Sequence, residues 1–310
     1  MSDKSADKKQ LIIRTALRLF STKGARTTSM QDIADLCGIS KGSLYLHFKS
    51  KEELEAAIYN YCFKKLEDQM QLAEHAPGLT PREKLQKQIV VLLSQVVELR
   101  EYLKMQFMEY SDAGKLPDQH EHMRRNNLKL LLLLKGKMSE IYGPAVSPYL
   151  GDLLLLIHGM LSSCIQLLFL FTSLPFSLER VAGHLIELID HTAGLYMNRG
   201  KDPLITPKAL DWWIEKESSE LPEAPRHPLQ VIQELRQLPA GKQGGTQTAD
   251  DTYESLSILG EEFLRPEPRK AILTGMLSNL GHLEGDESAQ AGYRELKQLV
   301  QAAIERTGSG

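Results

Sequence analysis

Apolar side chains recur at three- and four-residue spacing along nearly the whole chain, and runs of alternating β-branched residues are hard to find. This pattern predicts an all-α protein. The first segment carries a single apolar stripe, made of Leu11, Ile12, Ala16, Leu19 and Phe20. Gly24 follows the stripe, where a helix is expected to end because glycine adopts the left-handed backbone conformation easily.

Two short helices joined by a turn are expected next. Ser29 stands at the N-cap position of the first, with Asp32 three residues further on, and Gly38 turns the chain. Ser40 caps the second short helix, which should run from residue 41 to residue 48. Two such helices held against a preceding helix are typical of a helix-turn-helix.

Longer amphipathic segments fill the rest of the chain. A fourth helix should begin after Ser50 and end near His75. The later helices are expected at residues 81–110, 118–142, 147–172, 177–199, 206–220, 228–238, 250–264, 268–283 and 287–306. We therefore expect three parts: a helix-turn-helix head at 1–54, a helical ligand-binding and dimerisation domain at 55–200, and an acidic helical extension at 201–310.

Residues 153–171 form a run of 19 residues without a formal charge, which is long enough to raise a transmembrane interpretation. The run contains His158 and Gln166, begins after Asp152 and lacks flanking basic and aromatic anchors, so a wholly buried helix is preferred and no membrane partner is expected. A second apolar helix follows directly. Two such helices from each of two chains would form a four-helix dimer interface. Small residues would permit their close approach, namely Gly159, Ser162, Gly183, Ala193 and Gly194.

Composition places the chain among ordinary soluble proteins, with 310 residues, 42% hydrophobic and 25% charged. The three cysteines form no Cys-x-x-Cys pair and no secretory signal is visible, so a reducing cytoplasm is expected. The formal net charge of −3 is uneven, because residues 1–54 carry ten basic and six acidic side chains and residues 201–310 carry twelve and eighteen. A basic head on an acidic body favours contact of the head with a polyanion, and statistical scatter is the alternative.

The second short helix begins with side chains suited to a DNA groove. Lys41 can reach a guanine edge or a phosphate, Ser43 can hydrogen-bond a base or a phosphate, and Gly42 leaves room for close approach of the backbone. Tyr45 and His47 lie on the expected solvent face and carry donors suited to phosphate oxygens. The alternative for these two, and for Lys51, is a solvated helix face without a partner.

At these residues the sequence resembles the tetracycline-repressor (TetR) family of bacterial transcription regulators. The resemblance runs from Ile12 to Leu54 and is strongest in the stretch ISKGSLYLHFKSKEEL. It implies a second, ligand-binding and dimerisation domain, which residues 55–199 fit in length and pattern, and most members of the family stop near Gly200. It also implies DNA contacts through Ser29 and Met30 to the backbone, Ser40, Lys41, Gly42, Ser43 and Leu44 in the major groove, and Tyr45, His47 and Lys51 to phosphates.

Candidate ligand-binding residues are polar or soft side chains within apolar helices, for which core packing is the alternative. They are Met105, Met108, Tyr110, His158, Gln166 and Phe169. The pair His120 and His122 and the trio His184, Glu187 and His191 have spacings that could touch a metal, but no further ligands support a site, so no metal or cofactor is expected. Motifs of hydrolases, phosphate loops and dinucleotide sites are absent from the sequence, which argues against an enzyme.

These observations predict a cytoplasmic, homodimeric transcription regulator that binds a pseudo-palindromic DNA operator. By analogy with the family it would be a repressor, released by a small apolar effector. The alternative is a DNA-binding protein whose extension, residues 201–310, binds a partner protein. Trp212 and Trp213, adjacent on one amphipathic helix, motivate that alternative.

Overall fold

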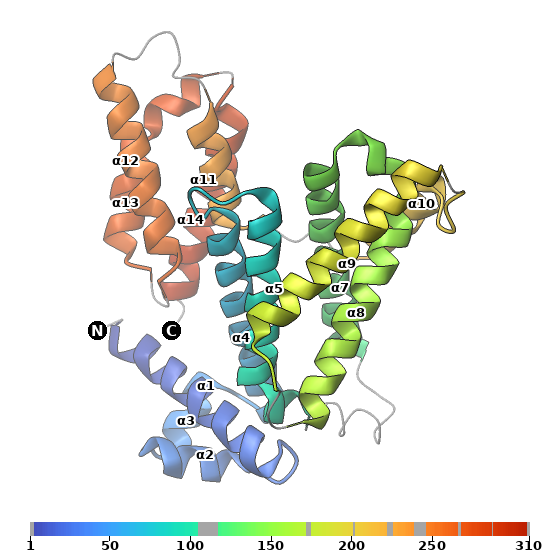
Figure 1. The fold of residues 1–310 in the computed structure, drawn as a ribbon. Coiled ribbons are helices and arrows are strands. Elements are labelled where there is room, and N and C mark those ends of the chain that lie inside the picture. The colour runs from blue at the N-terminus through green and yellow to red at the C-terminus, as the bar shows by residue number, and fades with distance from the viewer. Residues whose placement is uncertain are drawn as a thin grey trace. The chain divides into compact units, whose positions relative to one another are not determined.

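The computed structural model describes residues 3–104, 117–171, 175–200, 202–221, 226–238, 246–265, 268–286 and 288–308. Within these ranges the regular structure is helical and contains no strand, which confirms the predicted all-α class (Figure 1). The chain divides into two compact units. One unit holds residues 1–16, 29–61 and 224–310, and the other holds residues 17–28 and 62–223.

The helix-turn-helix consists of α2 (Met30–Cys37) and α3 (Lys41–His47), preceded by α1 (Asp3–Lys23). Helix α2 stops after eight residues because Gly38 adopts a left-handed conformation with φ +68°, and its N–H donates to the carbonyl of Asp35 at 3.1 Å. Gly24, with φ +86°, follows the end of α1. The predicted boundaries of this part are confirmed to within one or two residues.

Five long helices form the centre of the chain: α4 (Lys51–Glu74), α5 (Pro81–Glu98), α7 (Pro117–Tyr142), α8 (Leu150–Leu170) and α9 (Leu178–Arg199). Thr80 and Ser177 cap α5 and α9. Helix α5 ends at Glu98, earlier than the expected residue 110, and a 3₁₀ turn at Pro144–Tyr149 precedes α8. Buried side chains of α5, α7, α8 and α9 share one core, which includes Leu93, Met138, Leu153, Ile157 and Ile186.

Within one chain, helix α8 is buried on one side only, so its expected burial on every side stays a prediction that requires a second copy. Leu153, Ile157 and Leu161 are almost fully buried, whereas Leu155 and Leu170 on other faces are 54% and 75% exposed. Among the described residues, Pro144–Leu170 is the single helical segment long and apolar enough to cross a membrane by length and composition. The core helix of a soluble protein passes the same test, so this segment carries no membrane assignment.

Helix α10 (Pro207–Glu220) packs with the central helices. Its Leu210 is buried in their core, and Arg124 of α7 forms ion pairs with Glu217 at 2.9 Å and Glu220 at 2.6 Å. The segment that leads into α10 is also held in place. Two backbone N–H groups of this segment donate hydrogen bonds to the carboxylate of Asp152. The compact unit that contains the central helices therefore extends to residue 223, beyond the expected domain boundary at residue 200.

The C-terminal helices form a bundle with a core of its own. It contains α11 (Pro228–Gln237), α12 (Thr246–Phe263), α13 (Lys270–Asn279) and α14 (Gln290–Gly308), drawn in orange and red in Figure 1. Val231, Leu259, Leu273 and Leu296 are completely buried in it. Buried Glu262 accepts hydrogen bonds from the guanidinium and backbone N–H of Arg269, which hold the pKa of its carboxyl below the usual range. We refer to residues 226–308 as the C-terminal bundle.

Candidate DNA interface

Helix α3 presents one face to the protein and the other to solvent. Leu44 and Phe48 point inward and are 0% and 1% exposed, so the rotation of this short helix is fixed. Tyr45 and Leu46 consequently point outward, with exposed fractions of 41% and 88%. The helix begins at Ser40, whose hydroxyl oxygen accepts a hydrogen bond from the N–H of Ser43 at 3.1 Å.

The residues that the sequence assigned to DNA contact fall into three groups. Ser29, Ser40, Lys41, Gly42 and Tyr45 are exposed; Ser43, His47 and Lys51 are half-buried; Met30 and Leu44 are buried. The side chains of Met30 and Leu44 pack into the protein and do not reach a DNA groove, because burial of these apolar groups is what holds α2 and α3 in place. A DNA contact at these two positions, predicted from the resemblance, would therefore involve backbone atoms.

Ser29 is already engaged within the protein. Its hydroxyl oxygen accepts from the N–H of Asp32 at 3.1 Å, while its own N–H donates to the Asp32 carboxylate at 2.8 Å. The two residues form the capping box that starts α2. Ser29 thus fixes the first turn of α2, in addition to any contact that it makes with DNA.

Leu46 is a candidate contact that the sequence analysis did not single out. It lies on the outward face of α3 between Tyr45 and His47, and it is the most exposed large apolar side chain in the described residues. A leucine in that position matches an apolar feature of the major groove, the methyl group of thymine. The inward positions of Leu44 and Phe48, four residues apart, already placed residue 46 on the opposite side of the helix.

The surroundings of His47 are basic. Partial burial lowers the pKa of its imidazole below 6.5, and the positive charges of Lys8 and Lys9 on α1 lower it further. Lys9 also lies over the ring of Phe48, with its Nζ 5.6 Å from the ring centroid. The two lysines therefore add positive charge beside the outward face of α3, where a phosphate backbone would be attracted.

Known proteins share this helix-turn-helix. The family model of the bacterial regulatory proteins, tetR family, matches residues 12–58, which span α1 to the first turns of α4. The uncharacterized HTH-type transcriptional regulator YuxN of Bacillus subtilis is 31% identical over 291 residues, covering 90% of this chain and 93% of that protein. This chain belongs to the TetR family. It is therefore a DNA-binding transcriptional regulator with a helix-turn-helix, and the family's members are not enzymes.

Other relatives of this TetR-family regulator differ in the share of its chain that they match. YerO of Bacillus subtilis is 27% identical and covers 88% of this chain and 90% of its own length, whereas YhgD of the same species, 28% identical, covers 59% of this chain and 95% of its own. The solved structure of PfmR from Thermus thermophilus is 23% identical, with a TM-score of 0.45, and covers 57% of this chain and 96% of that one. Relatives of nearly full length thus exist beside shorter ones.

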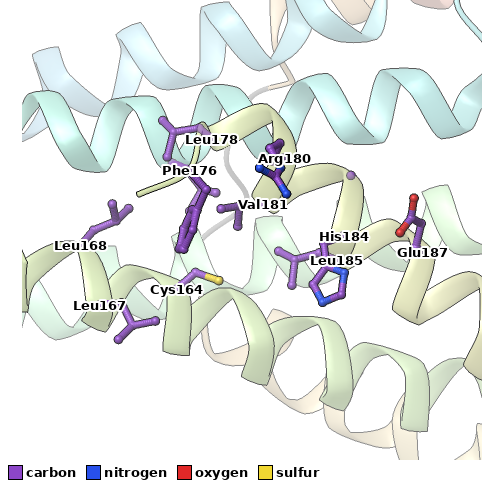
Figure 2. A pocket seen from close by; sticks show the side chains of 12 residues that line it. Cys164, Leu167, Leu168, Phe176, Leu178, Arg180, Val181, His184, Leu185 and Glu187 are labelled. Atoms are coloured by element: carbon purple, nitrogen blue, oxygen red, sulfur yellow. The ribbon is translucent and has the colours of Figure 1, made fainter. Parts of the chain in front are cut away.

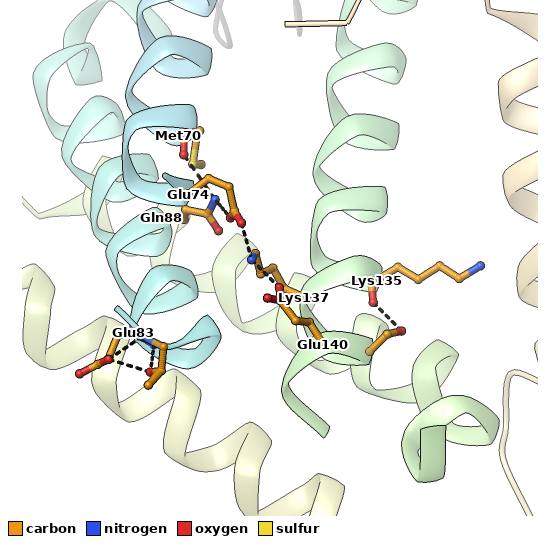
Figure 3. Close-up of polar contacts among 9 residues, drawn as sticks. Met70, Glu74, Glu83, Gln88, Lys135, Lys137 and Glu140 are labelled. Carbon is orange, nitrogen blue, oxygen red and sulfur yellow. Dashed lines mark hydrogen bonds and ion pairs between the residues drawn. The ribbon is translucent and has the colours of Figure 1, made fainter. Parts of the chain in front are cut away.

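The last turns of α4 are held by a polar cluster (Figure 3). Lys137 of α7 is 6% exposed, and its Nζ lies 2.7 Å from Glu74 and 2.6 Å from Glu140. Gln88 of α5 donates to the carboxylate of Glu74 at 3.0 Å and to the carbonyl of Met70 at 3.4 Å. Burial alone would lower the pKa of Lys137, but the hydrogen bonds and charges of the two carboxylates raise it above its usual value, so the ammonium stays charged.

The candidate ligand-binding residues that the structure describes do not line the pocket found in it. His158 and Gln166 lie on the exposed side of α8, and Phe169 is half-buried against the central core. Met105, Met108 and Tyr110 lie outside the described residues. A pocket of about 630 Å³ opens instead between α5, α8 and α9, where Leu93, Cys164 and Leu185 line it (Figure 2). Within the described part of the chain no three potential metal ligands cluster, and His184, Glu187 and His191 form no such group.

We expect operator binding to strengthen as the pH falls. The pKa of His47 is below 6.5 in the free protein, and a nearby phosphate favours the imidazolium, so binding takes up a proton. Between pH 8 and pH 6 the affinity should rise by roughly three- to tenfold, which corresponds to a pKa change of up to about one unit on binding. Fluorescence anisotropy with operator DNA at constant ionic strength measures the rise.

His47→Gln should abolish this rise, because glutamine does not titrate. His282→Gln serves as the control, since His282 is an exposed histidine of the C-terminal bundle. Equal pH dependence of the wild type and His47→Gln would show that His47 does not approach a phosphate.

Proposed function

We propose that this TetR-family regulator acts in the cytoplasm as a homodimeric repressor that binds a pseudo-palindromic operator and is released by a small, largely apolar effector. The outward face of α3 is the observation that carries the proposal, since one seven-residue helix reads only a few base pairs and a symmetric pair is needed for a specific site. The repressor KstR2 of Mycolicibacterium smegmatis, 43% identical over 49 residues and covered over 24% of its length, supports the assignment.

On the operator, some of these residues would contact base edges and others would contact phosphates. Lys41 and Ser43 in the first turn of α3 would meet base edges, with Leu46 against a thymine methyl group. Tyr45 and His47 would bind phosphates on either side of the groove and fix the orientation of the helix. Lys51, in the first turn of α4, would add a third phosphate contact.

An exposed apolar face on α8 and α9 supports dimerisation. On α8 it includes Leu155, Leu167 and Leu170, and on α9 it includes Leu188 and Leu195, all at least 42% exposed. Leucines exposed on two helices that are neighbours in the sequence are side chains that a second copy of the chain would cover. Two copies of this helix pair, related by a two-fold axis, would bury it in a four-helix arrangement.

The small residues expected at this interface differ in how accessible they are to a second copy. A Cβ atom added at Gly159 or Gly194 would meet no atom within 4 Å, so both glycines leave room for a second copy. Ala193 is fully buried in the core of its own chain and is not available to a partner. Gly183 faces Gln86, which lies 3.3 Å from the position of an added Cβ.

Release by an effector would act through α4, which continues directly from the helix-turn-helix. The buried cluster of Lys137, Glu74 and Gln88 ties the last turns of α4 to α5 and α7. An effector that displaces α5 or α7 would therefore move α4 with them. A coupling free energy of only about 1 to 3 kcal/mol is enough to change operator occupancy markedly.

Leu188→Glu should convert the dimer to a monomer, because it places a charge in the apolar face of α9. The matched control is Leu132→Glu on α7, where the leucine is 43% exposed, close to the 42% of Leu188. We expect a halved mass in sedimentation equilibrium and at least about tenfold weaker operator binding for Leu188→Glu only. Wild-type protein that is monomeric at micromolar concentration, or two variants that behave alike, would contradict this interface.

A second candidate function gives the C-terminal bundle a partner protein. Its separate core and its presence within the nearly full-length matches to YuxN and YerO favour this possibility. Trp212 and Trp213, the residues that first suggested it, are 62% and 46% exposed. They belong to α10, however, which packs with the central helices, so they carry no argument for a partner of the C-terminal bundle.

Deletion of residues 224–310 separates the two functions. If the bundle is dispensable for DNA recognition, the chain 1–223 should remain dimeric and bind the operator within about twofold of the full chain. If the bundle recruits a partner, the shortened chain should lose a protein that copurifies with the full chain. Deletion of residues 201–310 is the informative comparison, because it also removes α10 and should cost about 2 to 5 kcal/mol of stability through loss of buried Leu210. Insoluble 1–223 would show that the bundle is part of the regulator's fold.

A further inference from the structure

The pocket between α5, α8 and α9 has the dimensions of a small-molecule site. Its volume of about 630 Å³ lies within the usual range for ligand pockets, and side chains from three helices form its walls. The interior is apolar, with Leu93 from α5, Leu168 from α8, and Val181 and Leu185 from α9. Figure 2 shows the thiol of Cys164 directed toward α9 in the middle of this wall. An apolar chain or ring would be accommodated there.

Polar groups reach the same pocket from one helix only. Arg180, His184 and Glu187 of α9 line it, at spacings of four and three residues, so they lie along one side of the helix. Among the residues that the structure describes, none of these three side chains has a hydrogen-bond or ion-pair partner. Unpaired charged and polar side chains beside an apolar cavity are the groups that orient a ligand.

We propose that this pocket binds an amphipathic carboxylate, with its head group on Arg180 and His184 and its apolar body against Leu93, Leu168 and Leu185. The inference rests on the proposed function in that it names the chemical class of the effector. The planar guanidinium of Arg180 can bind both oxygens of a carboxylate, and His184, one turn further along α9, can donate a further hydrogen bond.

The positions of the charged side chains along α9 indicate that the head group of the ligand is negatively charged. Arg180 lies in the first turn of the helix, where the helix dipole favours a negative charge; Ser177 and Glu179 already accept hydrogen bonds in this turn. Glu187 lies seven residues from Arg180, about 10 Å along the helix axis, so its negative charge is remote from the guanidinium, although it lies only about 4.5 Å along the axis from His184. A cationic head would have to lie beside Glu187 and would leave Arg180 without a partner.

The location of the pocket links ligand binding to the proposed dimer. Leu167 and Phe176 line the pocket and are each 42% exposed, and Leu167 belongs to the apolar face assigned to the second copy. A ligand in the pocket therefore changes the shape of the surface on which the second copy packs. Its effect on the operator would arise from altered spacing of the two recognition helices.

Decanoate is the first probe, with decanol and decylamine as comparisons of equal chain length. Isothermal titration of the full chain should show saturable binding of decanoate and at least about tenfold weaker binding of the other two. Arg180→Ala should weaken decanoate binding by about tenfold, while Arg199→Ala, an exposed arginine in the last turn of the same helix, should leave it unchanged. Equal binding of decanol and decanoate, or equal effects of the two variants, would overturn the proposal.

Alkylation of Cys164 gives a second readout that does not depend on a variant. Burial raises the pKa of this thiol, so its reaction with N-ethylmaleimide is followed at pH 8 by peptide mass spectrometry. Decanoate should slow the modification of Cys164 severalfold and leave that of Cys37, in the helix-turn-helix, unchanged. Modification of Cys164 at the same rate with and without decanoate would overturn the site.

Operator binding by the same protein distinguishes failure of this site from failure of the proposed function. If decanoate does not bind while the operator is still bound, the carboxylate site is wrong and the regulator is unaffected. If decanoate binds but does not weaken operator binding, the pocket is a ligand site without the effector role. If the protein does not bind DNA at all, the proposed function fails whatever decanoate does.

Discussion

Burial of Leu44 and Phe48 fixes what this regulator can present to DNA. Both side chains are enclosed, and because Leu44 lies on the seven-residue helix and Phe48 is its C-cap, together they fix its rotation. Lys41, Tyr45 and Leu46 face outward as a direct consequence. Glycine-terminated turns and capping serines keep the two helices short enough for this arrangement, so the candidate interface depends on packing that contributes no DNA contact itself.

Local signals in the sequence were sufficient for the helix-turn-helix. Ser29 and Ser40 cap helices in the structure as they were predicted to do, because capping depends only on residues three or so positions apart. The TetR family was evident from the same stretch. The contact role of Met30 was not separable from the motif, since the packed structure shows that its side chain is enclosed.

Features that depend on distant parts of the chain were not predictable in the same way. The packing of α10 on the central helices depends on Asp152 and Arg124, which are about fifty and ninety residues away from their partners. The periodicity of α8 indicated an apolar helix but not which side a second chain would cover. His158 and Gln166 were polar within an apolar run and suggested a pocket, whereas their exposure places them on the surface, and the cavity found lies beside Cys164 instead.

Salt-dependent operator binding tests the central claim most directly. Affinity for the DNA upstream of the gene is measured between 50 and 200 mM salt for the wild type, Lys41→Ala, Tyr45→Ala and the control Lys64→Ala, whose lysine is exposed on α4. The account predicts at least about tenfold weaker binding for Tyr45→Ala, and for Lys41→Ala both weaker binding and a salt slope reduced by about one if the lysine contacts a phosphate. Wild-type affinity and slope in both variants would contradict the assignment of α3 as the DNA-reading helix.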